Sequence, residues 1–326
     1  MVVVKLMQGL GNQMFQYSAG KALSLHLNQP LKVNIDNYTP TSLRQYELGK
    51  YFNLKPEIVS SEEMSLFNLN HPVRRFWNKA FPSHKIKSLP YEEPYGAAKA
   101  LYNASYKIRK PHLQSVYEER HFHYDPHFFD AKAPIFLKGY WYSYKYFHAH
   151  KELLSHDFTV KEELVSHLDL VVKEMKEQNS IAIHVRCTDK LSPVHLKLHG
   201  KLSQSYYTTA LDHMRSKLGN DVTLYVFTDD VYTAKAYIPQ DVPVVWVSNY
   251  ITKSSIEDFY LMQFAKGVIT SNSTFSWWAA YLNKNENPLV VVPKKWYAKN
   301  TFDARDVYCD EWIKNKIYAY LPLNDY

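Results

Sequence analysis

The sequence has few cysteines and no long apolar run. Cys187 and Cys309 are the only cysteines among 326 residues, too few for a disulfide framework, and this favours a reducing compartment. No stretch is apolar over the roughly 20 residues that a membrane-spanning helix needs. Met1 leads directly into an apolar strand pattern, which leaves no room for a signal peptide. We therefore expect a cytoplasmic protein, either soluble or bound peripherally at the inner membrane surface.

The usual metal-binding patterns are missing as well. The chain has no D-x-D triplet, no H-E-x-x-H and no cysteine pair of metal-ligand spacing. The adjacent Asp229 and Asp230 come nearest to a metal site, and we interpret them as a turn at the end of a strand. We expect no metal and no cofactor.

The net charge is +7, which suits an anionic ligand, an anionic membrane surface or nucleic acid. Lysines and arginines are scattered, however, without a dense basic run or a recognisable nucleic-acid-binding motif. Nucleic acid is therefore not an expected partner. The net charge is the one feature that supports the alternative hypothesis of a nucleic-acid-binding protein.

The length and the 46% apolar content predict a large core and two domains, residues 1–160 and 161–326. The first half begins with a β–loop–α–β pattern: a strand at 2–6, a loop with two glycines at 7–13, a helix at 14–28 and a strand at 31–35. A glycine-rich turn in that setting allows close approach of the backbone to a ligand. Another strand is predicted at 135–137, and residues 60–125 are predicted as helices that cap the acceptor side. The final segment could pack back on the first domain.

A charged amphipathic helix predicted within 151–180 marks the domain boundary. Beyond it, strands and helices alternate regularly, which indicates a doubly wound α/β domain. The predicted strands are 181–185, 222–227, 244–247, 268–271 and 289–293. The predicted helices are 203–218, 232–238, 255–266 and 273–283.

Two strand ends of this second domain carry residues suited to an anion. Arg186 follows the strand 181–185, and a guanidinium group can donate to two phosphate oxygens at once. The alternative is a structural pair with Asp189. Small hydroxyl residues precede the helix at 273–283, where free N–H groups and the helix dipole favour an anion. The alternative there is that Ser271 or Ser273 only caps the helix.

Four stretches carry a resemblance to a known family. Residues 184–190 (HVRCTDK) resemble the H-x-R-R-x-D motif of fucosyltransferases that use GDP-fucose. Residues 9–17 (GLGNQMFQY), 44–48 (RQYEL) and 271–278 (SNSTFSWW) are similar to motifs of glycosyltransferase family 11, the α1,2-fucosyltransferases. They occur in the order of the family and span most of the chain, and Cys187 stands where the family has its second arginine.

The resemblance implies GT-B architecture, an α/β fold in which two Rossmann-like domains face each other across a cleft. It also implies inverting, metal-independent transfer of L-fucose from GDP-fucose to a hydroxyl of a β-galactoside, in α1,2 linkage. Such a reaction serves glycan, O-antigen or capsule assembly, and the implied partners are GDP-fucose and a β-galactoside-terminated glycan.

The resemblance also implies roles for individual residues. The core α1,6-fucosyltransferases place an aspartate at the guanine edge and the motif histidine beside the base, and the protein O-fucosyltransferases turn a similar Gly-Asn-Gln segment toward the donor. The implied donor-binding residues are His184, Arg186, Asp258, Ser271, Asn272, Ser273 and Thr274. The residues implied to act in catalysis or to line the cleft are Arg186, Asn12, Gly11, Gln13 and Lys190.

Asp36 and Cys187 are interpreted from their positions. Asp36 ends a strand, so its carboxylate could assist the acceptor hydroxyl, or it could only form an Asx turn. Successive side chains of a strand point to opposite faces. If Arg186 faces the donor, Cys187 should pack behind the strand as a small apolar residue. The competing hypotheses are a catalytically impaired GDP-sugar-binding or glycan-binding protein and a fucosyltransferase of another linkage.

Overall fold

The computed structural model describes residues 1–67, 115–119, 122–187, 199–298 and 302–315. The chain divides into two compact units. The first unit is Met1–Phe158 with Asn300–Tyr308, and the second is Thr159–Lys299 with Cys309–Tyr326. The chain thus returns to its first unit for one short segment before it ends in the second.

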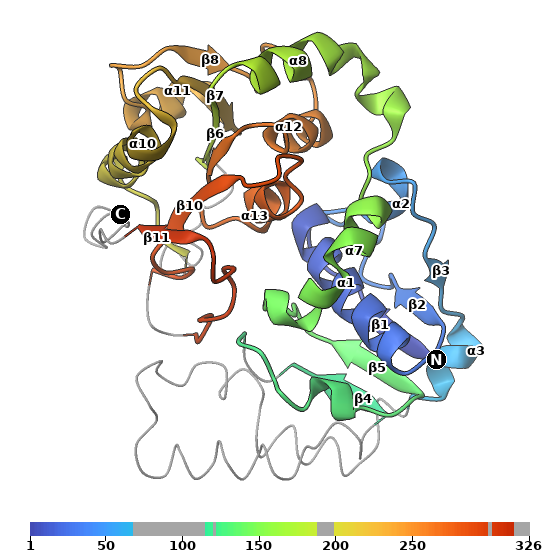
Figure 1. The fold of residues 1–326 in the computed structure, drawn as a ribbon. Helices are drawn as coiled ribbons and strands as arrows, with labels where there is room; N and C mark the ends of the chain where they lie inside the picture. Colours follow the sequence, from blue (N-terminus) through green and yellow to red (C-terminus); the bar gives the residue numbers. More distant parts are fainter. Residues whose placement is uncertain (68–114, 120–121, 188–198, 299–301, 316–326) are drawn as a thin grey trace, which may run out of the picture. The chain divides into compact units, whose positions relative to one another are not determined.

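The described part of the first unit contains a parallel sheet of five strands in the order β3-β2-β1-β5-β4 (Figure 1). Its strands are β1 (Val2–Lys5), β2 (Leu31–Asn34), β3 (Glu57–Ile58), β4 (Val116–Glu118) and β5 (Ile135–Lys138). Its helices are α1 (Leu10–His26), α2 (Leu48–Tyr51), α3 (Ser61–Ser65) and α7 (Lys151–Asp157), with 3₁₀ turns η2 (Phe128–Asp130), η3 (Tyr144–Tyr146) and η4 (His148–His150).

The central strand β1 is apolar because both of its faces are buried. On one face, α1 lies so close that a Cβ at Gly20 would meet Val4 at 3.0 Å. On the other face, Val3 packs with Phe136 and Phe67 in an apolar cluster. A continuous apolar run is the pattern expected of a parallel strand covered on both sides.

The loop predicted at residues 7–13 is shorter than expected. The turn is made by Gln8, which takes a left-handed φ of 67°, and by Gly9, which is the extended N-cap of α1. The helix therefore begins at Leu10, and Gly11, Asn12 and Gln13 lie in its first turn. The glycine spacing indicated a longer loop because glycine is uncommon inside helices.

The described part of the second unit contains a parallel sheet of six strands in the order β11-β10-β9-β6-β7-β8. Its strands are β6 (Ser180–Val185), β7 (Thr223–Thr228), β8 (Val244–Trp246), β9 (Gly267–Ile269), β10 (Leu289–Pro293) and β11 (Ile313–Asn315). Its helices are α8 (Asp169–Glu177), α10 (Gln204–Leu218), α11 (Val231–Ala234), α12 (Ser255–Met262) and α13 (Thr274–Tyr281), with 3₁₀ turns η5 (Glu162–Leu164), η6 (Ser166–Leu168) and η7 (Lys235–Tyr237).

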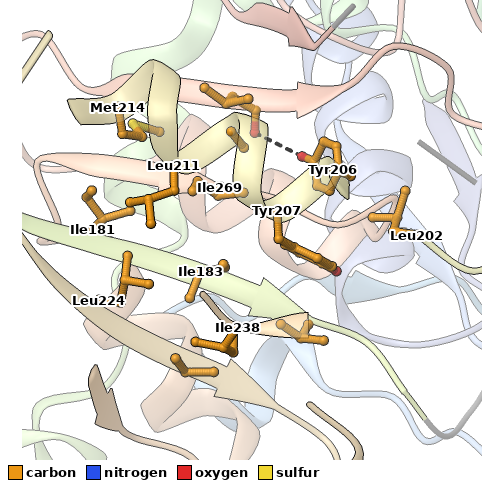
Figure 2. Close-up of a cluster of buried hydrophobic side chains, with 14 of the residues drawn as sticks. Ile181, Ile183, Leu202, Tyr206, Tyr207, Leu211, Met214, Leu224, Ile238 and Ile269 are labelled. Atoms are coloured by element: carbon orange, nitrogen blue, oxygen red, sulfur yellow. Dashed lines mark hydrogen bonds between the residues drawn. The ribbon is translucent and has the colours of Figure 1, made fainter. Parts of the chain in front are cut away.

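Helix α10 covers one face of this sheet with the side chains that its periodicity predicts. Figure 2 shows Tyr207, Leu211 and Met214 over the buried residues of β6 and the neighbouring strands. The Tyr206 hydroxyl donates to the Thr270 carbonyl at 2.7 Å, which joins the helix to the end of β9. Gly219 stops the helix with a φ of +89°, as predicted.

Helices α12 and α13 carry the large aromatic residues of the second unit. Trp277 and Trp278 are fully buried, and Trp277 stacks on Tyr281 with ring centroids 4.8 Å apart. The ring centroids of Phe275 and Phe259 lie 5.7 Å apart. Both tryptophans therefore belong to the core of this unit.

The helix predicted within 151–180 is not continuous. Helix α7 ends at Asp157, two 3₁₀ turns follow, and α8 occupies only Asp169–Glu177. Phe158, Val160, Val165 and Leu168 are buried, but their spacing of two, five and three residues does not keep one helical face. The β-branched pair Thr159-Val160 also disfavours a helix at the point where the chain changes unit.

The predicted α/β class is confirmed, because each unit carries a parallel sheet covered by helices, the Rossmann-like construction of GT-B proteins. The sequence patterns missed β3, β4 and β11, which are two or three residues long and too short to show periodicity. Within the described residues, no helix is long and apolar enough to cross a membrane.

Gly139 occupies the closest backbone approach in the first unit. The buried carboxylate of Glu119 accepts from the backbone N–H groups of Tyr140 and Trp141, both at 2.8 Å, so it lies directly against residue 139. A Cβ there would overlap the Glu119 Cβ and come within 2.9 Å of its Oε2. Only glycine fits beside this carboxylate.

We expect Gly139→Ala to lower the free energy of unfolding by about 1–3 kcal/mol, the usual cost of overpacking. Thermal melts followed by tryptophan fluorescence would measure the change. Gly9→Ala is the matched control, because its Cβ would meet Arg44 Cδ at 3.7 Å, an ordinary contact. Equal melting temperatures for the two variants would contradict the argument.

Candidate functional site

The end of β6 separates two kinds of side chain. Ile181, Ile183 and Val185 point into the core beneath α10. His184 and Arg186 alternate with them, and the His184 ring contacts Phe275 of α13 at 5.8 Å. The period of two along a strand therefore places His184 and Arg186 together on the opposite face.

Both side chains reach the segment that leads from β9 into α13. His184 Nδ1 and Ser271 Oγ lie 2.7 Å apart, and an Arg186 guanidinium N–H donates to Ser273 Oγ at 3.2 Å. Two sequence stretches 87 residues apart thus meet, as expected for the carboxyl ends of the neighbouring parallel strands β6 and β9.

Ser273 is the N-cap residue of α13, but its side chain makes no capping hydrogen bond. The hydroxyl accepts from Arg186 instead, so the alternative of a simple side-chain cap is wrong for this serine. The first N–H groups of a helix carry a partial positive charge. The guanidinium and the start of α13 therefore add two positive contributions at one place.

The side chain of Asn272 is anchored to the protein backbone. Its side-chain N–H₂ donates to the carbonyl of His199 at 2.7 Å and to that of Trp296 at 3.3 Å. Both amide hydrogens are directed at the protein backbone, so the side chain braces three segments around the site. Thr274, also predicted to bind the donor, is the half-buried first residue of α13.

A small pocket, open to solvent, lies at the carboxyl ends of β6 and β9. Arg186 and Lys201 supply positive charge to its lining, and Ser271 and Asn272 supply polar groups. Val185 and Tyr207 belong to its apolar part. The pocket thus joins the predicted anion site to a cation, Lys201, that no motif indicated.

Cys187 is buried beneath α10, in the same cluster as Val185. Its Sγ lies 3.8 Å from Thr228 Oγ1, and its backbone N–H donates to Asp229 Oδ1 at 2.6 Å. Burial raises the pKa of the thiol to about 11. The prediction that Cys187 packs behind the strand is confirmed.

The adjacent Asp229 and Asp230 form a turn, as predicted. Asp229 accepts from the Cys187 backbone, and Asp230 caps α11 by accepting from the Thr233 N–H at 3.3 Å and from its hydroxyl at 2.5 Å. Within the described residues, no group of three or more histidine, cysteine, aspartate or glutamate side chains could hold a metal ion.

Asp258, predicted to face guanine, is held by two hydroxyl groups. Ser248 donates to Oδ2 at 2.6 Å, and Thr252 donates to Oδ1. Burial raises the pKa of Asp258 to about 6, although both hydroxyls oppose that shift. Each carboxylate oxygen has a second lone pair, so the group can accept further hydrogen bonds while it fixes the loop between β8 and α12.

In the first unit, Gln13 is fully buried. Its side-chain N–H₂ donates to the carbonyls of Gln8 and Gln45 at 2.9 and 2.8 Å, and its Oε1 accepts from the Glu47 N–H at 2.9 Å. The whole amide of Gln13 is therefore used within the first unit. Its amide joins the 9–17 and 44–48 motifs, and Gly11 is likewise buried in α1.

Asn12 and Asp36 are the predicted residues of this unit that keep exposed surface. Asn12 Oδ1 accepts from the Tyr142 hydroxyl at 3.1 Å, and Asp36 Oδ2 accepts from the Asn34 amide at 2.7 Å. Burial and the nearby Lys138 lower the pKa of Lys5, whereas Asp36 raises it. Charged groups therefore gather at the carboxyl ends of β1, β2 and β5. Lys190 lies outside the described residues.

Sequence reasoning missed Lys201, the Ser248–Thr252 hydroxyl pair and Tyr142. None belongs to a motif, and each reaches its partner only through the fold. The one available signal was the position of Ser248 directly after a predicted strand, at the edge where polar residues gather.

We expect Cys187 to react with iodoacetamide at pH 8 about 100-fold more slowly than an unhindered thiol, because the thiolate is the reacting species. GDP should not change the rate. Mass spectrometry of the Cys187 and Cys309 peptides would follow the two sites separately. Rapid labelling of Cys187 that GDP blocks would place this residue in the ligand site instead.

Comparison with known proteins gives consistent results. The family model described as glycosyl transferase family 11 matches residues 94–316. The chain is 29% identical to an alpha-1,2-colitosyltransferase of Escherichia coli, over 96% of this chain and 98% of that protein. It is 28% identical to the O-antigen biosynthesis glycosyltransferase WbnK of Escherichia coli, over 94% and 97%.

A more distant relative is the mouse galactoside 2-alpha-L-fucosyltransferase Sec1, 23% identical over 62% of this chain and 55% of that protein. Among solved structures, the fucosyltransferase NodZ from Bradyrhizobium is similar with a TM-score of 0.48 and 14% identity, over 89% of this chain and 93% of that one. The family match covers more than half of the chain and includes β6, its arginine and the start of α13. The chain belongs to glycosyl transferase family 11.

Proposed function

We propose that this glycosyltransferase transfers L-fucose from GDP-fucose to the 2-hydroxyl of a β-galactoside, with inversion at the anomeric carbon. The observation that carries the proposal is the meeting of Arg186 with Ser273 at the start of α13. This arrangement offers positive charge where a departing diphosphate would develop negative charge. The name of the mouse relative supports the sugar and the linkage, whereas that of the Escherichia coli colitosyltransferase supports only the linkage.

In the proposed mechanism, the bond between the fucose anomeric carbon and the β-phosphate oxygen breaks as the acceptor hydroxyl attacks from the opposite face. Arg186 and the N–H groups of α13 stabilise the GDP that leaves, so no metal ion is required in this proposal. Asp36 is proposed to take the proton of the acceptor hydroxyl, because its exposed carboxylate lies two residues after the end of β2.

The second unit also supports a proposed guanine site. Asp258 can accept from guanine N1–H and N2–H₂, and adenine lacks this pair of donors. His184, fixed by Ser271, is proposed to lie beside the base. The motif has a second arginine where this chain has Cys187, and the cysteine is packed in the core beneath α10. This packing leaves no gap beside Arg186 and therefore supports an active enzyme.

A second candidate is transfer of colitose, the 3-deoxy counterpart of fucose. It is favoured by the alpha-1,2-colitosyltransferase that resembles this chain over 96% of its length. A site that hydrogen-bonds the 3-hydroxyl of fucose would discriminate strongly against colitose, whereas an apolar contact at that position would not.

The decisive experiment offers GDP-fucose and GDP-colitose with β-galactoside acceptors, followed by linkage analysis of the product by NMR. We expect an α1,2-fucosylated galactoside. Arg186→Ala should lower kcat by roughly 10²–10³, the usual cost of one preorganised donor to a developing charge. Arg215→Ala is the control, because that arginine lies on α10 and pairs with Asp241. Transfer of colitose alone would favour the second candidate, and GDP binding without transfer would favour a binding protein.

We expect GDP affinity to depend on Asp258 and on pH. The raised pKa means that the folded, ligand-free protein keeps this proton until about pH 6. A protonated carboxyl group loses acceptor capacity, so affinity should fall by up to about tenfold per pH unit below 6 and level off above it.

Calorimetric titration with GDP from pH 5 to 8 would measure this dependence. Asp258→Asn should bind GDP more weakly at pH 8, and the ratio of wild-type to variant affinity should lose its pH dependence above 6. Turnover at saturating donor should change less than KM. A ratio that stays constant from pH 5 to 8 would contradict the guanine role.

A further inference from the structure

The position of Lys201 in the Arg186 pocket has a consequence beyond the proposed function. Lys201 lies three residues before α10, in a segment with no motif, yet it shares a pocket lining with Arg186, Ser271 and Asn272. We propose that Lys201 is a second cation for the diphosphate of the donor nucleotide and binds it from the side opposite Arg186. This inference rests on the proposed function and names a residue that no motif assigns.

The fold brings Lys201 to this side of the β6 end. Burial raises the pKa of the Cys187 thiol and the Thr233 hydroxyl lowers that of Asp230, and the charge of Lys201 adds a smaller lowering contribution at both groups. Lys201 therefore lies near the tip of β6 and the turn after β7. Arg186 leaves the strand toward α13, where it meets Ser273. The two cations therefore approach the pocket from the α10 side and from the α13 side.

Lys201 is held by an aromatic ring and has carboxylates nearby. Its Nζ lies 5.1 Å from the centre of the Tyr237 ring, a contact that orients the ammonium group. Asp229 and Asp230 already accept hydrogen bonds from the Cys187 backbone and from Thr233. These carboxylates reduce the local positive potential, but each of them also accepts a hydrogen bond from a donor other than Lys201.

The chemistry of a diphosphate matches this pair of cations. A nucleoside diphosphate carries two to three negative charges on the oxygens of two neighbouring phosphate groups, and one guanidinium fork can engage only part of them. A lysine contributes a compact positive charge with three donors and needs no fixed plane. The motif position after Arg186 is the buried Cys187, so position 187 supplies no cation, and Lys201 supplies one from another segment.

Calorimetric titration of GDP and guanosine into the wild-type chain and three variants tests the proposal. Lys201→Gln should weaken GDP binding about 10–100-fold, the typical effect of one charge-assisted hydrogen bond. Guanosine, which lacks phosphate, should bind equally well to both proteins. Lys201→Arg should recover most of the GDP affinity. Lys217→Gln, a change of the same charge in the last turn of α10, should bind GDP as the wild type does.

The outcomes separate this inference from the proposed function. A wild-type chain that does not bind GDP would contradict both. GDP affinity unchanged in Lys201→Gln, beside normal wild-type binding, would overturn only the role of Lys201. Equal losses for GDP and guanosine would also overturn it, because they would mean that Lys201 supports the fold and not the phosphates. A Lys201→Arg variant that binds GDP as weakly as Lys201→Gln would also overturn the proposal, because the positive charge would then make no contribution.

Discussion

Successive side chains of β6 point to opposite faces of a sheet that is covered by helices on both sides, and much of the second unit depends on this alternation. Val185 and Cys187 complete the apolar contact with α10. The side chains of His184 and Arg186 alternate with these and point to the other face, where they contact Ser271 and Ser273 before α13. A shift of one residue in register would bury a guanidinium in the core and expose the apolar set. The core and the anion site are therefore set by the same register.

The polar groups of the second unit share another constraint, because a charge removed from water needs partners. Asp258 is surrounded by the Ser248 and Thr252 hydroxyls, yet burial still raises its pKa. Arg186 is only half-buried and finds Ser273. Under the proposed function, a bound ligand adds phosphate oxygens to the surroundings of the arginine and N–H donors to those of the carboxylate. Such pre-formed sites bind a ligand without a large cost of rearrangement.

The first unit shows that a family motif can be structural. Gln13 is buried and uses its whole amide to join the Gln8 turn to the 45–47 segment. Replacement would leave backbone groups unpaired in the interior, which is costly. The neighbouring Asn12 retains exposed surface and contacts Tyr142. Two adjacent residues of one motif thus have different surroundings, one buried and one partly exposed, because successive side chains of a helix point about 100° apart.

The amino-acid sequence alone determined the α/β class, most strands of the second unit, the inward face of α10 and the burial of Cys187. These follow from local periodicity, since hydrophobic side chains must share one face of each element. The sequence did not reveal the break between α7 and α8, the short strands β3, β4 and β11, or the early start of α1, because each depends on contacts with distant segments. It also could not distinguish side chains that brace neighbouring segments, such as Gln13 and Asn272, from side chains without that role, or associate Lys201 with Arg186. Those distinctions arise only when parallel strands bring their carboxyl ends together and each polar group takes the nearest available partner.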